Sequence, residues 1–211
     1  MAGAGTQLPV LVQRGEMLAD ADKALFLWIN ALAGHASAVD AAMGWVASDY
    51  LVPVCMGLTL VALWFIGRDV PERMRHQIGM FTALTAMALS SLVVLISNAL
   101  FFRPRPFDGL EGVGLLFYQP TDSSFPSNSA AVAFAIAAAV WCVNRRLGAA
   151  LFVAAAVYGF SRVYVGVHYP GDILGGAVIA VVVTALTLRL RDLMMPVLVA
   201  VIKAARLLAI A

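Results

Sequence analysis

The chain has 211 residues, of which 62% are hydrophobic and 12% are charged. Soluble domains average roughly 45–50% apolar and about 25% charged residues, so this composition indicates an integral membrane protein. The formal net charge of +2 is small and scattered, which argues against nucleic acid as a partner. No linker, low-complexity tract or repeat is visible, so we expect a single domain over residues 1–211, with its core at about 20–195.

The N-terminal region is the first in chain order and fits more than one interpretation. Its first residues lack a basic stretch followed by an apolar one, so we expect no cleavable signal peptide. Residues 24–47 are apolar but are interrupted by His35 and Asp40. This pattern fits either interfacial helices or a poor membrane span.

Stretches without Asp, Glu, Lys or Arg then predict five membrane-spanning helices, since a span needs about 17–25 residues. They are residues 50–67, 76–102, 123–144, 147–161 and 173–188, the fourth extended to about Val165 through Arg162. The final segment, 193–211, carries Lys203 and Arg206 and fits a further span or an interfacial helix. The expected fold class is therefore all-α, a polytopic membrane bundle of five spans plus one or two interfacial or additional helices.

Basic residues predict the orientation of this bundle. The arginine-bearing loops are segments 67–77, 144–146 and 189–192, and a path that alternates across the membrane places all three on one side. By the positive-inside rule that side is cytoplasmic. Segments 103–127 and 162–172 then lie together on the outer side.

Two polar clusters come from the first of these outer segments. The stretch RPRPF holds Arg103 and Arg105, each before a proline that biases the backbone toward an extended conformation. Residues two apart in an extended chain project to one face, so both arginines can face one anion. In the stretch FPSNSA, Ser127, Asn128 or Ser129 can cap the following helix, whose free N–H groups form a site for phosphate.

The third cluster, SRVYVGVHYPGD, supplies Arg162, His168 and Asp172. They offer a cation, a nucleophile or base, and a carboxylate that can hold the imidazole in one tautomer. Each cluster also has a purely structural explanation, because outer arginines extend toward lipid headgroups and Ser or Asp residues cap helices. An anion site is the simplest purpose that the three share. No set of carboxylates or histidines has metal-ligand spacing on this side, so no metal or other cofactor is expected.

Together the clusters resemble the type-2 phosphatidic acid phosphatase superfamily of lipid phosphatases. Its motifs are K-x6-R-P, P-S-G-H and S-R-x5-H-x3-D, and the third is intact here, ending at Asp172. The first keeps Arg105 but has Asn98 in place of the lysine, and the second keeps Ser127 but has Ser129 in place of the histidine. The stretches RPRPF, FPSN and GFSRVYVGVHYPGDILGG are most similar to bacterial undecaprenyl pyrophosphate phosphatases of the bacitracin-resistance type.

This resemblance implies a multi-pass protein of the bacterial inner membrane with its active site on the periplasmic side. The substrate would be an isoprenoid lipid diphosphate, cleaved to lipid monophosphate and inorganic phosphate as the lipid carrier of peptidoglycan biosynthesis is recycled. The lipid tail would enter sideways between helices. A homodimer stays open, because Gly175 and Gly176 suit close helix packing either within the chain or between protomers.

The resemblance also implies roles for single residues. His168 would attack the terminal phosphorus and form a phosphohistidine, with Asp172 orienting its ring. Donors from all three clusters would hold the phosphoryl oxygens: Arg105, Arg162, Ser127 and backbone N–H groups near Asn128, with Arg103 assisting.

Ser129 stands where the superfamily has a histidine that protonates the leaving group. A serine hydroxyl is too weak an acid to do this near neutral pH, and general acid catalysis contributes roughly 10²–10⁴-fold. A lipid diphosphate releases a phosphate monoester with a second pKa of about 6, so it needs that proton less than a lipid monophosphate does. The sequence therefore predicts an impaired diphosphatase, with Ser129 either an engineered inactivating change or a natural departure.

Two other functions remain open on the sequence alone. A phosphotransferase of the same fold would pass the phosphoryl group to another lipid, and its turnover would depend on that acceptor. A non-catalytic lipid-phosphate binder would keep the arginines, and its binding of a diphosphate would survive His168→Ala.

Overall fold

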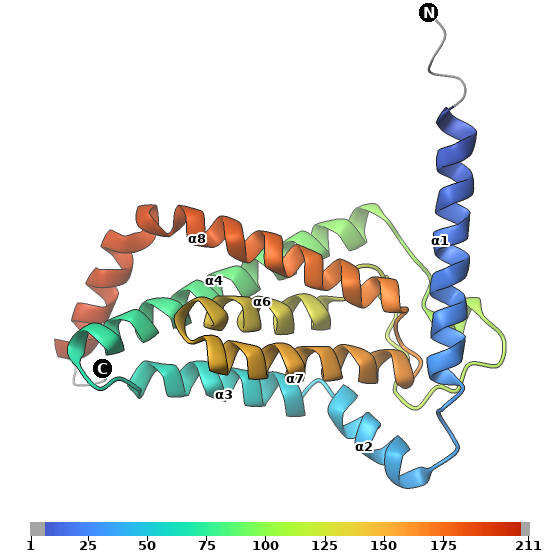
Figure 1. The fold of residues 1–211 in the computed structure, drawn as a ribbon, viewed down its shortest axis with the longest axis horizontal. Coiled ribbons are helices and arrows are strands. Elements are labelled where there is room, and N and C mark those ends of the chain that lie inside the picture. Colours follow the sequence, from blue (N-terminus) through green and yellow to red (C-terminus); the bar gives the residue numbers. More distant parts are fainter. Residues whose placement is uncertain (1–6, 208–211) are drawn as a thin grey trace, which may run out of the picture.

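The computed structural model describes residues 7–207, and every regular element in that range is a helix. In chain order these are α1 (Gln7–Asn30), α2 (Ser37–Ala47), α3 (Leu51–Phe65), α4 (Val70–Leu100), α5 (Pro106–Gly109), α6 (Asn128–Val143), α7 (Arg145–Tyr164) and α8 (Pro170–Leu207). Helices α3, α4, α6, α7 and the first part of α8 run along the long axis of the molecule (Figure 1). The predicted all-α class is confirmed.

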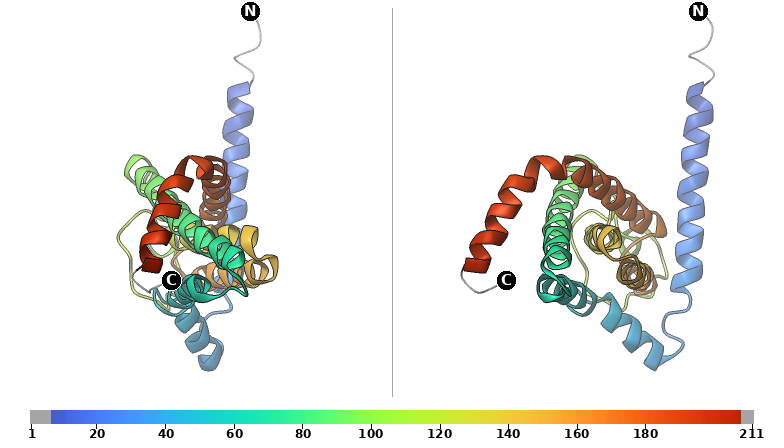
Figure 2. Two further views of the ribbon diagram at one scale, coloured as in Figure 1. Left: turned by 90° about the vertical axis from the view of Figure 1, so that its left-hand side faces the viewer. Right: turned by 60° about the vertical axis from the view of Figure 1, so that its left-hand side comes forward.

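Helix α6 lies at the centre of this bundle, packed against α4, α7 and α8 (Figures 1 and 2). Its buried positions are mostly alanines: Ala130, Ala131, Ala133, Ala135, Ala137 and Ala139. Methyl side chains let neighbouring helix backbones approach closely, and close packing is what holds membrane helices together. The alanine-rich sequence of α6 therefore explains its place inside the bundle.

Gly176 of α8 allows α8 to approach the start of α6. A Cβ at Gly176 would lie 2.4 Å from the carbonyl oxygen of Ser127 and 3.0 Å from the Cβ of Ala130. A Cβ at Gly175 would lie 2.6 Å from the ring of Phe125. Both glycines thus pack within this chain, and Gly176 fixes where α6 begins relative to α8.

Three helices in the described part of the chain are long and apolar enough to cross a membrane: Val70–Leu100, Arg145–Tyr164 and Pro170–Leu193. Helices α2 and α3, bent by 46° at their break, make a fourth if they are taken as one span. Helix α6 is apolar but has 16 residues, about 24 Å at 1.5 Å per residue, against a hydrocarbon core of about 30 Å. Five full-length spans are therefore not seen, because α6 is a short helix enclosed by its neighbours.

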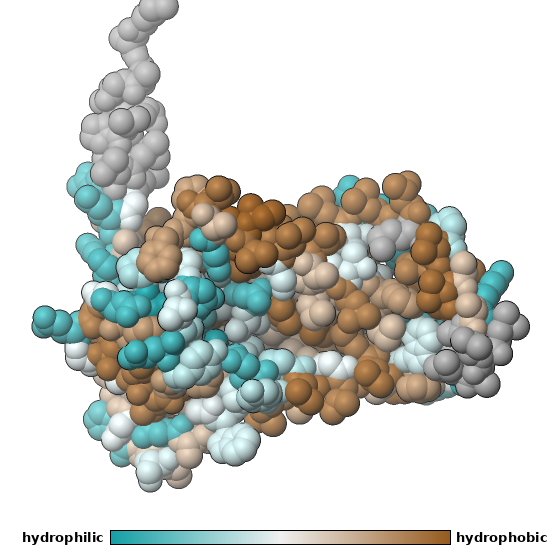
Figure 3. All heavy atoms as spheres, turned by 180° about the vertical axis from the view of Figure 1, so that it is seen from behind, coloured by the Kyte–Doolittle hydropathy of each residue, from teal (hydrophilic) through white to brown (hydrophobic). Residues whose placement is uncertain are grey.

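The surface of the bundle matches a lipid environment. Apolar atoms cover its long side, whereas hydrophilic atoms gather mainly at the end where α1 stands (Figure 3). Large apolar side chains of α4 and α8 are exposed, among them Leu92, Leu95, Leu174, Val178 and Val182. An apolar surface of this extent marks contact with a membrane.

The two ambiguous segments are resolved differently. Residues 24–47 divide between the end of α1 and α2, and α1 lies across the bundle axis (Figures 1 and 2). That direction suits a helix in the membrane interface. Residues 193–207 continue α8, which contains Pro196 and turns in its C-terminal part (Figure 1); proline accounts for such a turn. Residues 208–211 lie outside the described part.

The connections between helices sort to two ends of the bundle. The α3–α4 and α6–α7 connections lie at one end, and the α4–α6 and α7–α8 connections lie at the other (Figure 1). Arg68, Arg145 and Arg146 belong to the first end and the three polar clusters to the second. The grouping agrees with the expected path for the first two basic segments, whereas the third, 189–192, lies within α8 and is not a loop. The assignment of the first end to the cytoplasm stays a prediction.

We expect Gly176→Ala to destabilise the protein by about 1–3 kcal/mol, because the new methyl group must push α8 away from α6. Thermal unfolding of the detergent-purified protein measures this. Gly44→Ala is the matched control: a Cβ there meets nothing within 4 Å, and alanine is favoured over glycine in a helix by about 1 kcal/mol. Equal effects of the two substitutions would contradict the proposed α6–α8 contact.

Candidate functional site

The three polar clusters meet at one cavity of about 230 Å³ at the end of the bundle that holds the α4–α6 and α7–α8 connections. Residues from each cluster line it: Arg105, Asn128, Ser129, Arg162 and His168. Asp49, Tyr118 and Asp122 also line this cavity. Segments more than sixty residues apart in sequence are therefore brought to one place.

His168 lies in the connection between α7 and α8 and is buried. Its Nε2 lies 3.3 Å from Arg105 Nη1 and 3.3 Å from Ser127 Oγ. Its Nδ1 lies 3.1 Å from the carbonyl oxygen of Ser124 and 3.6 Å from Asp172 Oδ2. Because both partners of Nδ1 are acceptors, the proton belongs on Nδ1, and the lone pair of Nε2 faces Arg105 and Ser127.

Asp172 is fully buried in the first turn of α8. Its Oδ2 accepts hydrogen bonds from Ser124 Oγ and from the backbone N–H of Tyr169, the latter at 2.8 Å. Its Oδ1 accepts from Arg103 Nη1 at 2.6 Å. The carboxylate is thus held in one orientation beside His168, while the Ser124 carbonyl is the nearer partner of Nδ1.

Arg105 is almost wholly buried and is held at three points. Its Nη2 donates to Asp122 Oδ1 at 2.7 Å, its Nε to the Asp122 carbonyl at 3.1 Å, and its Nη1 to the Val167 carbonyl at 2.8 Å. These contacts leave Nη1 directed toward His168 Nε2. A buried charge held in this way is ready to meet an anion without rearrangement.

Arg162, in the last turn of α7, contributes a second buried guanidinium group. Its Nη1 donates to the carbonyl of Ala47 at 2.8 Å and to Asp49 Oδ1 at 3.0 Å. Its Nε is buried and has no hydrogen-bond partner within the described residues. The guanidinium group also lies over the ring of Phe117, 5.0 Å from its centroid, and Arg162 lines the cavity.

The start of α6 forms another wall of the cavity. Of the three capping candidates, Ser127 is the N-cap, and its Oγ accepts from the backbone N–H of Ala130 at 3.4 Å. Asn128 and Ser129 occupy the first turn, where free N–H groups and the helix dipole favour an anion. The side chain of Ser129 interacts with that of Tyr158.

Arg103 is placed differently from the expectation that it shares a face with Arg105. Its guanidinium group pairs with Asp172 and with Asp22 Oδ2, the latter at 2.7 Å, and it does not line the 230 Å³ cavity. Arg105 has φ −74° and ψ 159°, the polyproline II region. That conformation repeats about every three residues, so side chains two apart diverge.

Several residues at this end of the bundle were not predicted: Asp22, Asp49, Tyr118, Asp122 and Ser124. Asp49 directly precedes the apolar stretch 50–67, and a carboxylate at the end of a span is a signal that sequence analysis can use. Asp22 does not directly precede or follow a predicted span, so the sequence does not single it out. The other two histidines, His35 and His76, do not line the cavity, and His76 Nδ1 lies 2.7 Å from the Ile66 carbonyl.

A second cavity, of about 200 Å³, adjoins the first. Both are lined by Asp49, Asn128 and Ser129. Beyond these residues the second cavity is mostly apolar, formed by Pro53, Met56, Val132, Ala133, Ile136 and Tyr158 of α3, α6 and α7. A polar cavity that continues into an apolar one suits a ligand with an anionic head and a hydrocarbon tail.

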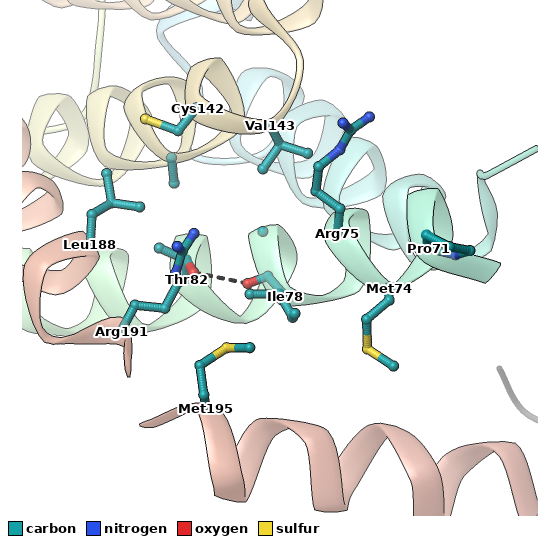
Figure 4. A pocket seen from close by; sticks show the side chains of 12 residues that line it. Pro71, Met74, Arg75, Ile78, Thr82, Cys142, Val143, Leu188, Arg191 and Met195 are labelled. Atoms are coloured by element: carbon teal, nitrogen blue, oxygen red, sulfur yellow. Dashed lines mark hydrogen bonds between the residues drawn. The ribbon is translucent and has the colours of Figure 1, made fainter. Parts of the chain in front are cut away.

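A larger cavity, of about 320 Å³, lies between α4, α6 and α8 and is shown in Figure 4. Arg75 and Arg191 line it together with Met74, Met195 and other mostly apolar side chains. None of the predicted site residues lines it, and it has no histidine or carboxylate. Size alone therefore does not identify the site, and the convergence of His168 with two buried arginines does.

Among the described residues, no group of three or more His, Cys, Asp or Glu side chains is arranged to hold a metal ion.

Comparison with known proteins shows the family of the chain. Residues 79–195 match the PAP2 superfamily. The chain is 33% identical over 172 residues to the undecaprenyl-diphosphatase BcrC of Bacillus subtilis (strain 168), an alignment that covers 82% of this chain and 85% of that protein. The chain belongs to the PAP2 superfamily, which confirms the resemblance inferred from the motifs.

Two crystal structures resemble the fold. LpxE of Aquifex aeolicus has a TM-score of 0.60 and 28% identity, over 78% of this chain and 93% of that one. The first transmembrane PAP2-type phosphatidylglycerolphosphate phosphatase from Bacillus subtilis has a TM-score of 0.60 and 18% identity, over 83% of this chain and 87% of that one. At that identity the second likeness concerns the fold alone. The protein is thus a multi-pass membrane protein with the all-helical architecture of this superfamily.

Burial lowers the pKa of the His168 imidazole below its usual value of about 6.5. The nearby carboxylate of Asp172 acts in the opposite direction, and the charge of Arg105 acts in the same direction as burial. The neutral ring therefore persists as the pH falls below 6.5, and Nε2 keeps its lone pair there. We expect the His168 signal in an NMR titration of histidine-labelled protein to titrate at lower pH than in the unfolded chain.

His168→Ala assigns that signal among the three histidines of the chain. Titration of the His168 ring at or above the pH seen in the unfolded chain would show that its surroundings do not favour the neutral form.

Proposed function

We propose that this protein is a membrane-embedded phosphatase that hydrolyses an isoprenoid lipid diphosphate, above all undecaprenyl diphosphate, to lipid monophosphate and inorganic phosphate. The observation that carries the proposal is the position of His168 Nε2, 3.3 Å from both Arg105 Nη1 and Ser127 Oγ, beside a polar cavity that continues into an apolar one. The identity to BcrC of Bacillus subtilis supports this class of substrate. The positive-inside rule favours the periplasmic side for the site.

In the first step His168 Nε2 attacks the terminal phosphorus. A nitrogen–phosphorus bond forms as the bond from that phosphorus to the bridging oxygen breaks, and the bridging oxygen leaves with the electron pair as part of the lipid monophosphate. The proton on Nδ1 stays in place, directed at the Ser124 carbonyl with the Asp172 carboxylate nearby. That negative charge stabilises the positive charge that the ring gains.

In the second step an oxygen–phosphorus bond forms from water as the Nε2–phosphorus bond breaks. The electron pair returns to Nε2, the ring becomes neutral again, and inorganic phosphate leaves while a proton from the water passes to solvent. In both steps charge develops on the phosphoryl oxygens. We propose that Arg105 and Arg162, which line the cavity, stabilise this charge together with the Ser127 hydroxyl and the N–H groups at the start of α6. The buried position of these donors strengthens their effect.

Ser129 determines how fast the first step is. It lines both cavities, at the motif position where the superfamily has the histidine that protonates the leaving group. A hydroxyl does not replace an imidazolium as an acid near neutral pH. We therefore propose an impaired enzyme that hydrolyses lipid diphosphates slowly and lipid monophosphates far more slowly, because an alkoxide is the poorer leaving group.

We expect His168→Ala to abolish release of inorganic phosphate from a polyprenyl diphosphate, since it removes the nucleophile. Ser129→His should raise the rate by roughly 10²–10⁴-fold, the usual contribution of a general acid. A phosphate assay on the purified protein measures both, with the exposed His35→Ala as the control that loses a histidine outside the site.

Phosphate release that persists in the His168→Ala variant would contradict the proposed mechanism. If Ser129→His has no effect while the parent protein binds the diphosphate tightly, a non-catalytic binder takes the place of the enzyme.

A further inference from the structure

Asp22 lies on α1, outside the residues 79–195 that match the superfamily, and yet it reaches the catalytic end of the bundle. Its side chain is 14% exposed. Its Oδ2 accepts from Arg103 Nη2 at 2.7 Å, and its Oδ1 accepts from the backbone N–H of Gly171 at 2.7 Å. A helix that stands across the bundle thus supplies a largely buried carboxylate next to the site (Figures 1 and 2).

Both contacts of Asp22 lead directly to Asp172. Arg103 donates to Asp22 through Nη2 and to Asp172 Oδ1 through Nη1, the latter at 2.6 Å, so one guanidinium group bridges two carboxylates. Arg103 is fixed further by stacking over the ring of Tyr169, 4.1 Å from its centroid. Gly171 immediately precedes Asp172, and a Cβ there would lie 2.8 Å from Asp22 Oδ2. The close approach of α1 to the first turn of α8 therefore requires a glycine at position 171.

We propose that Asp22 is a positioning residue of this site: by holding Arg103 and the first turn of α8, it keeps Asp172 in place behind His168. The inference rests on the proposed function, and it extends the catalytic machinery to a helix outside the matched region. Asp22 itself does not line the 230 Å³ cavity, so it acts through Arg103 and Asp172.

The pairing of Arg103 with both Asp22 and Asp172 also affects the charge near His168. His168 is influenced by two cations, Arg105 of the α4–α6 connection and Arg162 of α7, and by the carboxylate of Asp172. With Asp22 present, the positive charge of Arg103 is shared between two carboxylates, so Asp172 keeps more of its effect on the ring. Without Asp22, Arg103 would neutralise Asp172 alone, and the positive ring formed during phosphoryl transfer would be less stabilised.

The decisive variant is Asp22→Asn. It removes the charge, while the amide oxygen can still accept from the Gly171 N–H. Asp20→Asn is the matched control, because Asp20 lies on the same helix with a side chain that is 77% exposed and pairs with Lys23 at 3.7 Å. Phosphate release, thermal unfolding and the NMR titration of the His168 ring are measured on the full-length protein for the parent and both variants.

We expect Asp22→Asn to lower kcat by roughly tenfold to a hundredfold with KM changed less than about threefold, since misplacing a catalytic group affects the chemical step more than binding. The His168 ring should titrate at lower pH than in the parent, because negative charge near it is lost. Asp20→Asn should match the parent in both respects.

The outcomes separate this inference from the proposed function. If the parent releases no phosphate but Asp22→Asn still shifts the His168 titration, the enzyme proposal fails and the coupling of Asp22 to the site stands. If Asp22→Asn lowers the unfolding temperature while kcat and the His168 titration equal those of Asp20→Asn, Asp22 only anchors α1 and the inference is overturned.

Discussion

The catalytic end of this protein depends on one buried charge, the carboxylate of Asp172. A fully buried carboxylate is stable only when it is paired and hydrogen-bonded. Its partners come from distant parts of the chain: Arg103 after α4, Ser124 before α6, and the backbone N–H of Tyr169 before α8. Satisfying Asp172 therefore draws the α4–α6 and α7–α8 connections together, and His168 lies between them with Nδ1 facing acceptors and Nε2 facing donors.

The packing of α6 places the start of this helix, with its free N–H groups, beside that histidine. Small residues on α6 and Gly176 on α8 bring the two helices close together, and the same contact positions Ser127 against His168. Because α6 is short and enclosed, its first turn borders a polar cavity on one side and an apolar cavity on the other. A lipid diphosphate has the same division between an anionic head and an apolar chain, which is why the geometry favours it over a soluble phosphate ester.

Ser129 lines both cavities. Its identity affects proton donation in the proposed mechanism but not the groups that would bind phosphate. The parts that hold a phosphoryl group do not involve its hydroxyl, since Arg105 and Arg162 are held by Asp122, Asp49 and backbone carbonyls. What serine lacks is an acid of suitable strength. In the proposed mechanism the chain therefore keeps the nucleophile and the cationic phosphate-binding groups, while Ser129 replaces the proton donor of the motif.

The sequence by itself determined the all-helical membrane class, the clustering of polar residues at one end and the pairing of His168 with Asp172. These follow from local properties, namely apolar stretches, loop charges and a motif confined to twelve residues from Ser161 to Asp172. The divergence of Arg103 from Arg105, the short enclosed α6 and the entry of Asp22 into the site were decided only by tertiary structure. Arg103 and Asp22 are 81 residues apart, and which carboxylate captures a guanidinium group at that separation depends on how helices pack, because no local periodicity or spacing records it.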